Sequence, residues 1–244
     1  MTLKISHLTG GYGQTNTIKD LNFTIEAGTV TALIGLNGSG KTTTINHVIG
    51  LMQPKSGLIS FNGQDSKSDS SNYQRNLAYI PELPIIYEDL TLREHIQTTI
   101  AAYHLDSKLL KDKIAKLLKI FRLEDKLAWF PIDFSKGMRQ KVMIVLALLT
   151  DAPLLVVDEP FIGLDPLAVS DLIDLLKEKK AAGTTILMST HLVEGAEKFV
   201  DQFLLIDRGR IRAKGKMKDI FKAFPQQKTI NEIYLHLARE AANG

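Results

Sequence analysis

The sequence of 244 residues contains no cysteine. A chain without cysteine forms no disulfide, no thiolate metal site and no cysteine nucleophile. It also lacks an apolar run near the ~18 residues that cross a bilayer, since the longest, 142–149, fits a buried helix. The first residues show no apolar core of a secretory signal, because residues 3–8 alternate like a strand. We therefore expect any work at a membrane to be done from its surface.

The chain also lacks a strong charge of one sign. It carries 30 basic and 27 acidic residues, a formal net charge of +3, and 44% of its residues are hydrophobic. This balance gives no reason to expect a nucleic-acid partner. The apolar content is that of an ordinary globular protein.

The stretch from Gly35 to Thr42 fits the phosphate-loop pattern G-x-x-x-x-G-K-[ST], between a predicted strand and a predicted helix. The glycines let backbone N–H groups turn toward phosphate oxygens at the positive end of the helix. Lys41 can reach the β- and γ-phosphates, and the Thr42 hydroxyl can bind Mg²⁺. A plain glycine turn would not require Lys41 and Thr42. We assign nucleotide binding to Gly35, Asn37, Gly38, Ser39, Gly40, Lys41, Thr42 and Thr43.

Two carboxylates follow a second buried strand. Residues 154–157 are all apolar and lead into Asp158 and Glu159. The strand would bring both side chains to the edge of the sheet beside the phosphate loop. Asp158 would hold Mg²⁺, and Glu159 would polarise the attacking water. The alternative is a pair of solvated carboxylates in a turn.

A further phosphate-binding device is expected at Ser135. This serine would cap a helix, with Gly137 allowing close approach of a phosphate to the backbone. An ordinary N-cap without a ligand is the alternative.

Alternating strand and helix patterns predict an α/β fold, interrupted by a helical block. We expect strands at 3–8, 18–25, 29–34, 57–63, 77–80, 154–157 and 184–189, a hairpin of 203–206 with 210–213, helices at 92–103, 107–123, 135–149, 166–182 and 192–199, and a loop at 65–72. We predict one domain over 1–244. Its ATP-binding core spans 1–87 and 150–225, a helical subdomain is inserted at 88–149, and a helical tail occupies 226–244.

Together these motifs resemble the ATP-binding-cassette (ABC) ATPases. The phosphate loop is similar to Walker A, 154–159 to Walker B, 134–138 to the LSGGQ signature, 163–165 to the D-loop and 189–191 to the switch histidine. The resemblance implies a P-loop NTPase with a RecA-like core, an antiparallel β subdomain and an inserted α-helical subdomain. It implies that Tyr12 stacks on adenine, that Asp165 belongs to the D-loop, and that His191 touches the γ-phosphate as a catalytic residue beside Glu159. For His191, a cap of the following helix is the alternative.

The chain departs from the family pattern at two places. Phe134, Lys136 and Met138 replace the signature's Leu, first Gly and Gln. Glu82 stands at the Q-loop position, where it keeps an oxygen for Mg²⁺ but lacks the amide donor.

Further segments are similar to one branch of the family, transporter ATPases associated with protein secretion and peptide handling in Gram-positive bacteria. These are 9–12, 79–82, 129–131, 134–138 and 158–161. The resemblance implies an ATP- and Mg²⁺-dependent ATPase that forms a homodimer and powers a separate polytopic permease. It would work from the cytoplasmic face of the cell membrane.

Two other functions remain open from the sequence. A soluble ABC ATPase that acts on nucleic acid or ribosomes would carry two cassettes or a long coiled coil before the signature. The segment from Lys41 to Ser135 is too short to contain such an insert. A non-catalytic nucleotide-binding module would not need Glu159 and His191.

Two surface features also stay open. A helix over 107–123 would present a basic face, either to anionic lipid or to solvent. Residues 129–131 belong either to the core or to the surface that contacts a permease.

Overall fold

The computed structural model describes residues 1–191 and 196–242. A four-stranded antiparallel sheet has the order β2-β1-β4-β5. Its strands are β1 (Leu3–Gly10), β2 (Ile18–Ile25), β4 (Ser56–Phe61) and β5 (Gln64–Asp65). Along β1 buried and less buried residues alternate, as expected where only one face meets the core.

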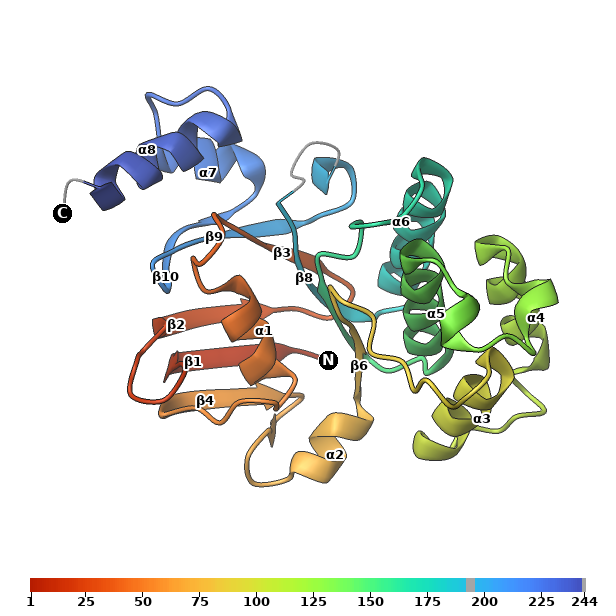
Figure 1. The fold of residues 1–244 in the computed structure, drawn as a ribbon. Helices are drawn as coiled ribbons and strands as arrows, with labels where there is room; N and C mark the ends of the chain where they lie inside the picture. Colours follow the sequence, from red (N-terminus) through yellow and green to blue (C-terminus); the bar gives the residue numbers. More distant parts are fainter. Residues whose placement is uncertain (192–195, 243–244) are drawn as a thin grey trace.

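A six-stranded sheet lies beside the first and has the order β10-β9-β3-β8-β7-β6 (Figure 1). Its strands are β3 (Val30–Ile34), β6 (Leu77–Ile80), β7 (Leu154–Asp158), β8 (Thr185–Ser189), β9 (Gln202–Asp207) and β10 (Arg210–Gly215). The pairs β9-β3, β3-β8, β8-β7 and β7-β6 are parallel, and β10 closes the edge as an antiparallel hairpin with β9. Every residue of β3, β7 and β8 is buried, as in a sheet that is covered on both faces.

Each face of the large sheet has its own hydrophobic core. On β3, Ala32 and Ile34 join the cluster that contains α5 and α6, whereas Leu33 joins the cluster shared with the small sheet and α1. The parallel strands therefore end at one edge with their tips held rigidly between two cores.

Helices α3 (Leu92–Ala102), α4 (Lys111–Phe121) and α5 (Lys136–Leu149) lie between β6 and β7 in the chain and, with α6 (Pro166–Ala181), gather on one side of the sheet (Figure 1). The others are α1 (Lys41–Val48), α2 (Ser70–Arg75), α7 (Met217–Ala223) and α8 (Ile230–Ala242). Thr91 starts α3 with the expected capping box, in which its hydroxyl accepts from the Glu94 N–H and the Glu94 carboxylate accepts from the Thr91 N–H. Among the described helices, none combines the length and the apolar character that a membrane span requires.

The predicted loop at 65–72 is wrong in its second half. Asp69 caps α2, which begins at Ser70. The local sequence is polar and serine-rich, so it carries no helical pattern. Tertiary contact supplies the missing stabilisation, because Tyr73 is 2% exposed and its hydroxyl donates to the Val48 carbonyl at 2.7 Å.

Two other predicted helices have different limits. The helix expected at 107–123 spans only Lys111–Phe121, and Arg122 ends it in the left-handed region at φ 59°. The helix expected at 192–199 falls partly outside the described residues; within them, Ala196–Lys198 forms a 3₁₀ turn.

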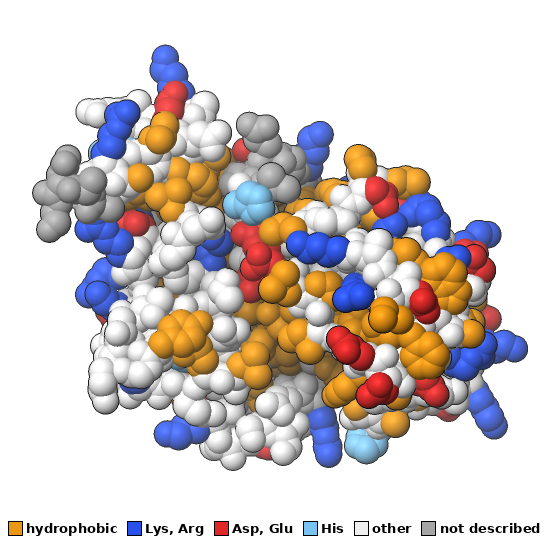
Figure 2. Space-filling model, in the orientation of Figure 1, with side chains coloured by type: hydrophobic (Ala, Val, Ile, Leu, Met, Phe, Trp, Pro, Cys, Tyr) orange, Lys and Arg blue, Asp and Glu red, His pale blue; other side chains and the backbone are white. Residues whose placement is uncertain are grey.

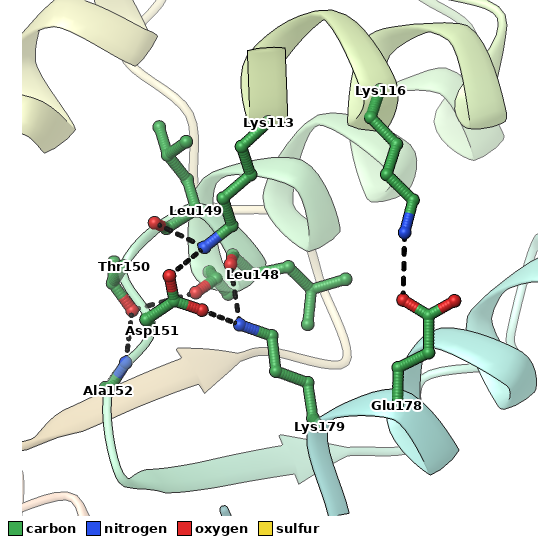
Figure 3. Close-up of polar contacts among 10 residues, drawn as sticks. Lys113, Lys116, Leu148, Leu149, Thr150, Asp151, Ala152, Glu178 and Lys179 are labelled. Carbon is green, nitrogen blue, oxygen red and sulfur yellow. Dashed lines mark hydrogen bonds and ion pairs between the residues drawn. The ribbon is translucent and has the colours of Figure 1, made fainter. Parts of the chain in front are cut away.

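Part of the basic face of α4 is bound to the protein itself (Figure 3). The Lys113 ammonium group donates to the Leu149 carbonyl at 3.0 Å and pairs with Asp151 at 2.5 Å. Lys116 pairs with Glu178 on α6 at 2.9 Å. These cations therefore fasten α4 to the neighbouring elements, which explains their presence without a lipid partner.

Candidate active site

The phosphate loop joins the end of β3 to the start of α1. Gly40 caps α1 at φ 112° and Gly38 lies at φ 77°, conformations that side-chain-bearing residues rarely adopt. The Lys41 ammonium group bends back to the carbonyls of Gly35 (2.9 Å) and Leu36 (3.3 Å). The loop thus lies at the N-terminus of α1 and carries a buried lysine, an arrangement that suits a phosphate group.

Acidic side chains surround this lysine. Burial lowers the pKa of Lys41, and Glu159, Asp158 and Glu82 oppose that shift by their charges. Lys41 is only 6% exposed, so the ammonium group is held in place rather than solvated. Glu82 is far from Asp158 and Glu159 in the sequence, and the parallel pairing of β6 with β7 brings the three carboxylates to one edge of the sheet.

Asp158 lies at the tip of β7 and is 1% exposed. Burial raises the pKa of its carboxyl, the hydrogen bond from the Ser189 hydroxyl at 2.5 Å lowers it, and the charges of Glu82 and Glu159 raise it again. A hydrogen bond involving the Thr42 hydroxyl also lowers this pKa, so Thr42 and Asp158 are neighbours. Ser189 therefore orients Asp158 from the adjacent strand tip.

Glu159 and His191 form a pair. Glu159 has left-handed backbone (φ 45°) and accepts from the His191 N–H at 3.1 Å, while the His191 imidazole Nδ1 lies 2.8 Å from the same carboxylate oxygen. The Glu159 N–H in turn donates to the Ser189 hydroxyl at 3.0 Å. The carboxylate is buried and pre-oriented, whereas the histidine side chain is 47% exposed toward the cleft.

A cleft of about 880 Å³ holds most of the predicted site. Figure 2 shows acidic side chains and a histidine in the middle of this face, where the surface is hollowed. The lining residues are Tyr12, Thr17, Gly35, Leu36, Asn37, Gly38, Gly40, Lys41, Thr42, Thr43, Glu82, Glu159, Ile162, His191, Asn231 and Tyr234. Tyr12 is 58% exposed, so its ring is free to stack on a ligand.

The signature segment lies apart from this cleft. Ser135 caps α5, accepting from the Met138 N–H at 3.3 Å. A Cβ on Gly137 would lie 2.6 Å from the Gly163 carbonyl, so only glycine fits this approach. Neither Ser135 nor Gly137 is among the described residues that line the cleft of the same chain.

Asp165 is likewise held outside the cleft lining. It caps α6 and pairs with Lys141 of α5 at 2.6 Å. The Lys141 hydrogen bond, with the Ala168 N–H, lowers the pKa of Asp165 to about 2. The ion pair fixes the predicted D-loop against the signature helix.

Residues 129–131 are partly packed against the protein and partly exposed. Trp129 stacks on Phe134 with ring centroids 6.0 Å apart and carries the Lys126 ammonium group 3.9 Å over its ring. Phe130 is 42% exposed. The segment therefore anchors itself through Trp129 and presents Phe130 to the outside.

Several residues of the site were not predicted. The sequence identifies Ser189 only as part of the segment that resembles the switch histidine, and it assigns Asn231 and Tyr234 to a helical tail. For Ser189, the signal in the sequence is a hydroxyl at the end of a predicted buried strand. For α8, nothing in the sequence indicates that it folds back onto the phosphate loop.

The residues suit Mg²⁺ in their chemistry. Mg²⁺ prefers hard oxygen ligands and is held by one or two carboxylates together with phosphates. Thr42, Asp158 and Glu82 offer one hydroxyl and two carboxylates around a cluster of negative charge.

Comparison with known proteins identifies the family of the chain. The ABC transporter family model matches residues 18–162. The chain belongs to the ABC transporter family, as an ATP-binding cassette with ATPase activity.

Among curated relatives, the chain is 44% identical over 241 residues to the ABC-type transporter ATP-binding protein EcsA of Bacillus subtilis, which covers 98% of both chains. It is 34% identical to the SkfA peptide export ATP-binding protein SkfE of the same organism, over 90% of this chain and 89% of the relative. The resemblance to one branch of the family is thus confirmed.

Solved structures match as well. One described as the ATP-binding subunit of an ABC transporter has a TM-score of 0.92 and 46% identity, covering 98% of this chain and all of the other. A dimeric ATP-binding cassette bound to ADP and Pi has a TM-score of 0.78 at 23% identity, over 88% and 98% of the two chains, and shows the shared fold. The predicted fold class is confirmed.

Proposed function

We propose that this ATP-binding subunit hydrolyses Mg-ATP in a site that two copies of the chain build together. The observation that carries the proposal is the division of the site within one chain. The phosphate loop, Glu159 and His191 line one cleft, while Ser135 and Asp165 lie elsewhere. A second copy would bring its Ser135 and Gly137 to the open side of the cleft. The dimeric architecture of a cassette with the same fold supports this arrangement.

Each residue has a defined role in the proposed reaction. Tyr12 stacks on adenine, and the loop from Gly35 to Thr43 binds the phosphates. Lys41 leaves the Gly35 and Leu36 carbonyls far enough to reach the β- and γ-phosphates. Mg²⁺, held by Thr42, Asp158 and Glu82, neutralises charge on the phosphates when bound.

Glu159 accepts a proton from the attacking water. Its carboxylate is 10% exposed and already oriented by the His191 N–H, so little reorganisation is needed. His191 holds the carboxylate on one side and reaches the γ-phosphate on the other. Binding of ATP closes the dimer, and hydrolysis opens it.

We further propose that a separate, EcsB-like polytopic permease docks beside Glu82. After this residue the chain exposes Leu83 (62%), Ile85 (72%) and Tyr87 (68%). A group of exposed apolar side chains is typical of a surface that contacts another protein. Ile85 and Tyr87 also line a groove of about 190 Å³ together with residues of α3 and α5. Figure 2 shows hydrophobic side chains exposed over the half of this face that carries α3–α5.

The docking surface connects directly to the ATP cleft. Glu82 lines the cleft, and its neighbour Pro81 accepts a hydrogen bond from the buried Gln140 side chain of α5 at 3.0 Å. Movement of Glu82 on ATP binding would therefore reach both α5 and the docking surface. The protein would lie at the cytoplasmic face of the cell membrane as a peripheral subunit.

Export or secretion-linked transport is the proposed direction. It rests on relatives named for export, including SkfE and the Nod factor export ATP-binding protein I of Cupriavidus pinatubonensis, 32% identical over 86% of this chain and 64% of the relative. The nearly balanced charge gives no support to an action on nucleic acid or ribosomes.

Co-purification from the native cell tests the proposal. The tagged chain should recover a stoichiometric polytopic membrane protein from gently solubilised membranes. Ile85→Ser with Tyr87→Ser should lose that protein and keep the ATPase activity of the isolated chain. Leu109→Ser is the matched control, since Leu109 is 81% exposed but is not among the described residues that line the groove. Recovery on ribosomes or DNA alone would contradict the transporter role.

A further inference from the structure

The C-terminal helix α8 forms one wall of the ATP cleft. Asn231 and Tyr234, one turn apart on this helix, line the cleft together with the phosphate loop. The helix is firmly attached, because Ile233 and Leu237 on its other face are 0% and 1% exposed in the main hydrophobic core. The position of Tyr234 against the loop is therefore built into the fold.

Further contacts hold α8 in place. Phe224 and His236 meet edge to face with ring centroids 6.2 Å apart. Arg212 of β10 pairs with Glu240 at 3.1 Å. Because β10 and α8 are joined in this way, α8 is part of the cassette rather than a loose extension.

The Tyr234 hydroxyl is buried, yet it has no hydrogen-bond partner among the described residues. Burial raises the pKa of Tyr234 to about 12; the backbone of Gly35 beside the hydroxyl opposes this rise, and the charge of Glu159 adds to it. Tyr234 therefore lines the same cleft as Gly35, the first residue of the phosphate loop, and Glu159, the predicted catalytic carboxylate.

The Tyr234 hydroxyl would act on the phosphate loop through the backbone of Gly35. Its carbonyl accepts from Lys41 at 2.9 Å, and a Cβ here would lie 2.2 Å from the Ile206 carbonyl. The Gly35 backbone thus has little freedom, and a hydroxyl beside it bears directly on the shape of the loop.

We propose that Tyr234 is a further positioning residue of the ATP site, whose hydroxyl completes its hydrogen bond with the Gly35 backbone when the loop closes on a nucleotide. Hydrogen bonds at active sites are often poorly aligned until the ligand is bound, and then tighten. Through this bond, α8 and the nucleotide stabilise one another, since coupling between two binding events is reciprocal.

Tyr234→Phe should affect the stability of the nucleotide-free protein and the stability of the nucleotide complex in opposite directions. A buried hydroxyl without a partner costs stability, so Tyr234→Phe should leave the melting temperature without nucleotide unchanged or raise it. In the complex the same variant loses a hydrogen bond. Its Kd for both Mg-ADP and the non-hydrolysable Mg-AMPPNP should rise about 3- to 10-fold.

A purely structural tyrosine behaves differently. Tyr103→Phe is the matched control, because the Tyr103 hydroxyl donates to the Leu77 carbonyl at 2.8 Å, away from the cleft. This control should lower the melting temperature and leave nucleotide affinity unchanged.

Calorimetric titration of the full chain measures the Kd values, and thermal unfolding measures the melting temperatures, that test the role of Tyr234. Kd values within twofold of the parent for Tyr234→Phe would overturn the inference, as would a loss of melting temperature equal to that of Tyr103→Phe. Weakening confined to AMPPNP would overturn the route through Gly35.

The inference rests on the proposed ATP site, so Lys41→Ala separates the two. Loss of binding in Lys41→Ala with normal binding in Tyr234→Phe overturns only the role of Tyr234. Normal binding in Lys41→Ala overturns the ATP site and the role of Tyr234 together.

Discussion

At the scale of residues, Glu159 carries the proposed chemistry. Replacing it by Gln keeps the shape and the contact with the His191 N–H but removes the basic oxygen. We expect ATP turnover to fall at least about 10²-fold, the usual contribution of a general base, with nucleotide affinity unchanged within a few-fold. Steady-state phosphate release and equilibrium binding measure the two effects. Glu124→Gln, a change of the same chemistry outside the cleft, should have no effect; unchanged turnover in Glu159→Gln would contradict the assignment.

Gly10 lies against the His47 ring of α1, the helix that follows the phosphate loop. A Cβ at this position would lie 2.1 Å from Nε2 of His47, whose ring is 1% exposed and held by a 2.7 Å contact between Nδ1 and the Thr43 carbonyl. Gly10→Ala should therefore lower the free energy of unfolding by about 1–3 kcal/mol, the usual cost of overpacking. Urea unfolding measures the change.

The control for Gly10→Ala is the same substitution in a His47→Ala background. Removing the ring opens the space that the new methyl group needs, so Gly10→Ala should then cost much less. Equal costs in both backgrounds would show that the ring is not the obstacle.

The sequence identifies candidate site residues where a motif fixes their spacing, and most of them line one cleft. The phosphate loop, the pair Asp158–Glu159 and His191 all have neighbours of defined type in the chain. Tyr234 could not be predicted, because its relation to Gly35 depends on how α8 folds back across the molecule. Ser189 is intermediate, since its contacts with Asp158 and Glu159 follow from the neighbouring positions of β7 and β8.

At the scale of elements, Asp151 joins α4 and α6 to the end of α5 (Figure 3). It pairs with Lys113 and with Lys179, whose side chains are 24% and 16% exposed. Asp151→Asn tolerates the left-handed backbone at φ 52° but leaves these two cations facing each other. Because the Asp151 carboxylate is itself 63% exposed, solvent screens these ion pairs, and we expect a loss of about 1 kcal/mol in the free energy of unfolding.

Lys116→Gln is the comparison for Asp151→Asn. Its ion pair with Glu178 is exposed on both sides (56% and 61%), so its loss should cost under about 1 kcal/mol. Chemical unfolding at neutral pH gives both values. A cost of Asp151→Asn no larger than that of Lys116→Gln would contradict the structural role of this cluster.

The same cluster predicts a dependence on pH. Burial opposes the charged form of Asp151, but hydrogen bonds to Lys113 and Lys179 prevail and lower the pKa of Asp151 from 3.8. Because its pKa is lowered in the folded state, the ionised Asp151 carboxylate stabilises the fold fully above pH 3.8. This stabilisation is lost as the pH falls through the lowered pKa. The difference in stability between the parent and Asp151→Asn should stay constant from pH 8 to about 5 and shrink only below pH 3.8; a loss of the difference near neutral pH would point to another group.

The elements themselves were predicted to different degrees. Strands with uniform apolar or alternating patterns were predicted within a residue or two, as were helices with caps such as Thr91 and Ser135. The short helix α2 was missed because Tyr73 anchors it by a contact with α1 that no local pattern reveals. The C-terminal end of α4 was overextended because Arg122 adopts a left-handed conformation that is rare for its type.

At the scale of the whole molecule, the division of the site explains why the chain would act as a pair. The cleft holds the phosphate loop and the Glu159–His191 pair. Ser135, which caps α5, and Asp165, which pairs with Lys141 of α5, are not among the described residues that line it. The parallel sheet and the α3–α5 group create this separation, and the α/β class with an inserted helical block could be predicted from the order of strand and helix patterns. The groove that we propose as the docking surface could not be predicted from the sequence, since it is lined by residues from β6, α3 and α5.

The most direct test of the paired site is the mass of the Glu159→Gln protein in solution with and without Mg-ATP. Light scattering should report the 27.1 kDa of one chain without nucleotide and twice that mass with Mg-ATP. Ser135→Arg in the same background should bind ATP but stay at the mass of one chain, because the partner's phosphate could no longer approach the cap of α5. A Glu159→Gln protein that binds Mg-ATP and keeps the mass of a single chain would contradict the account.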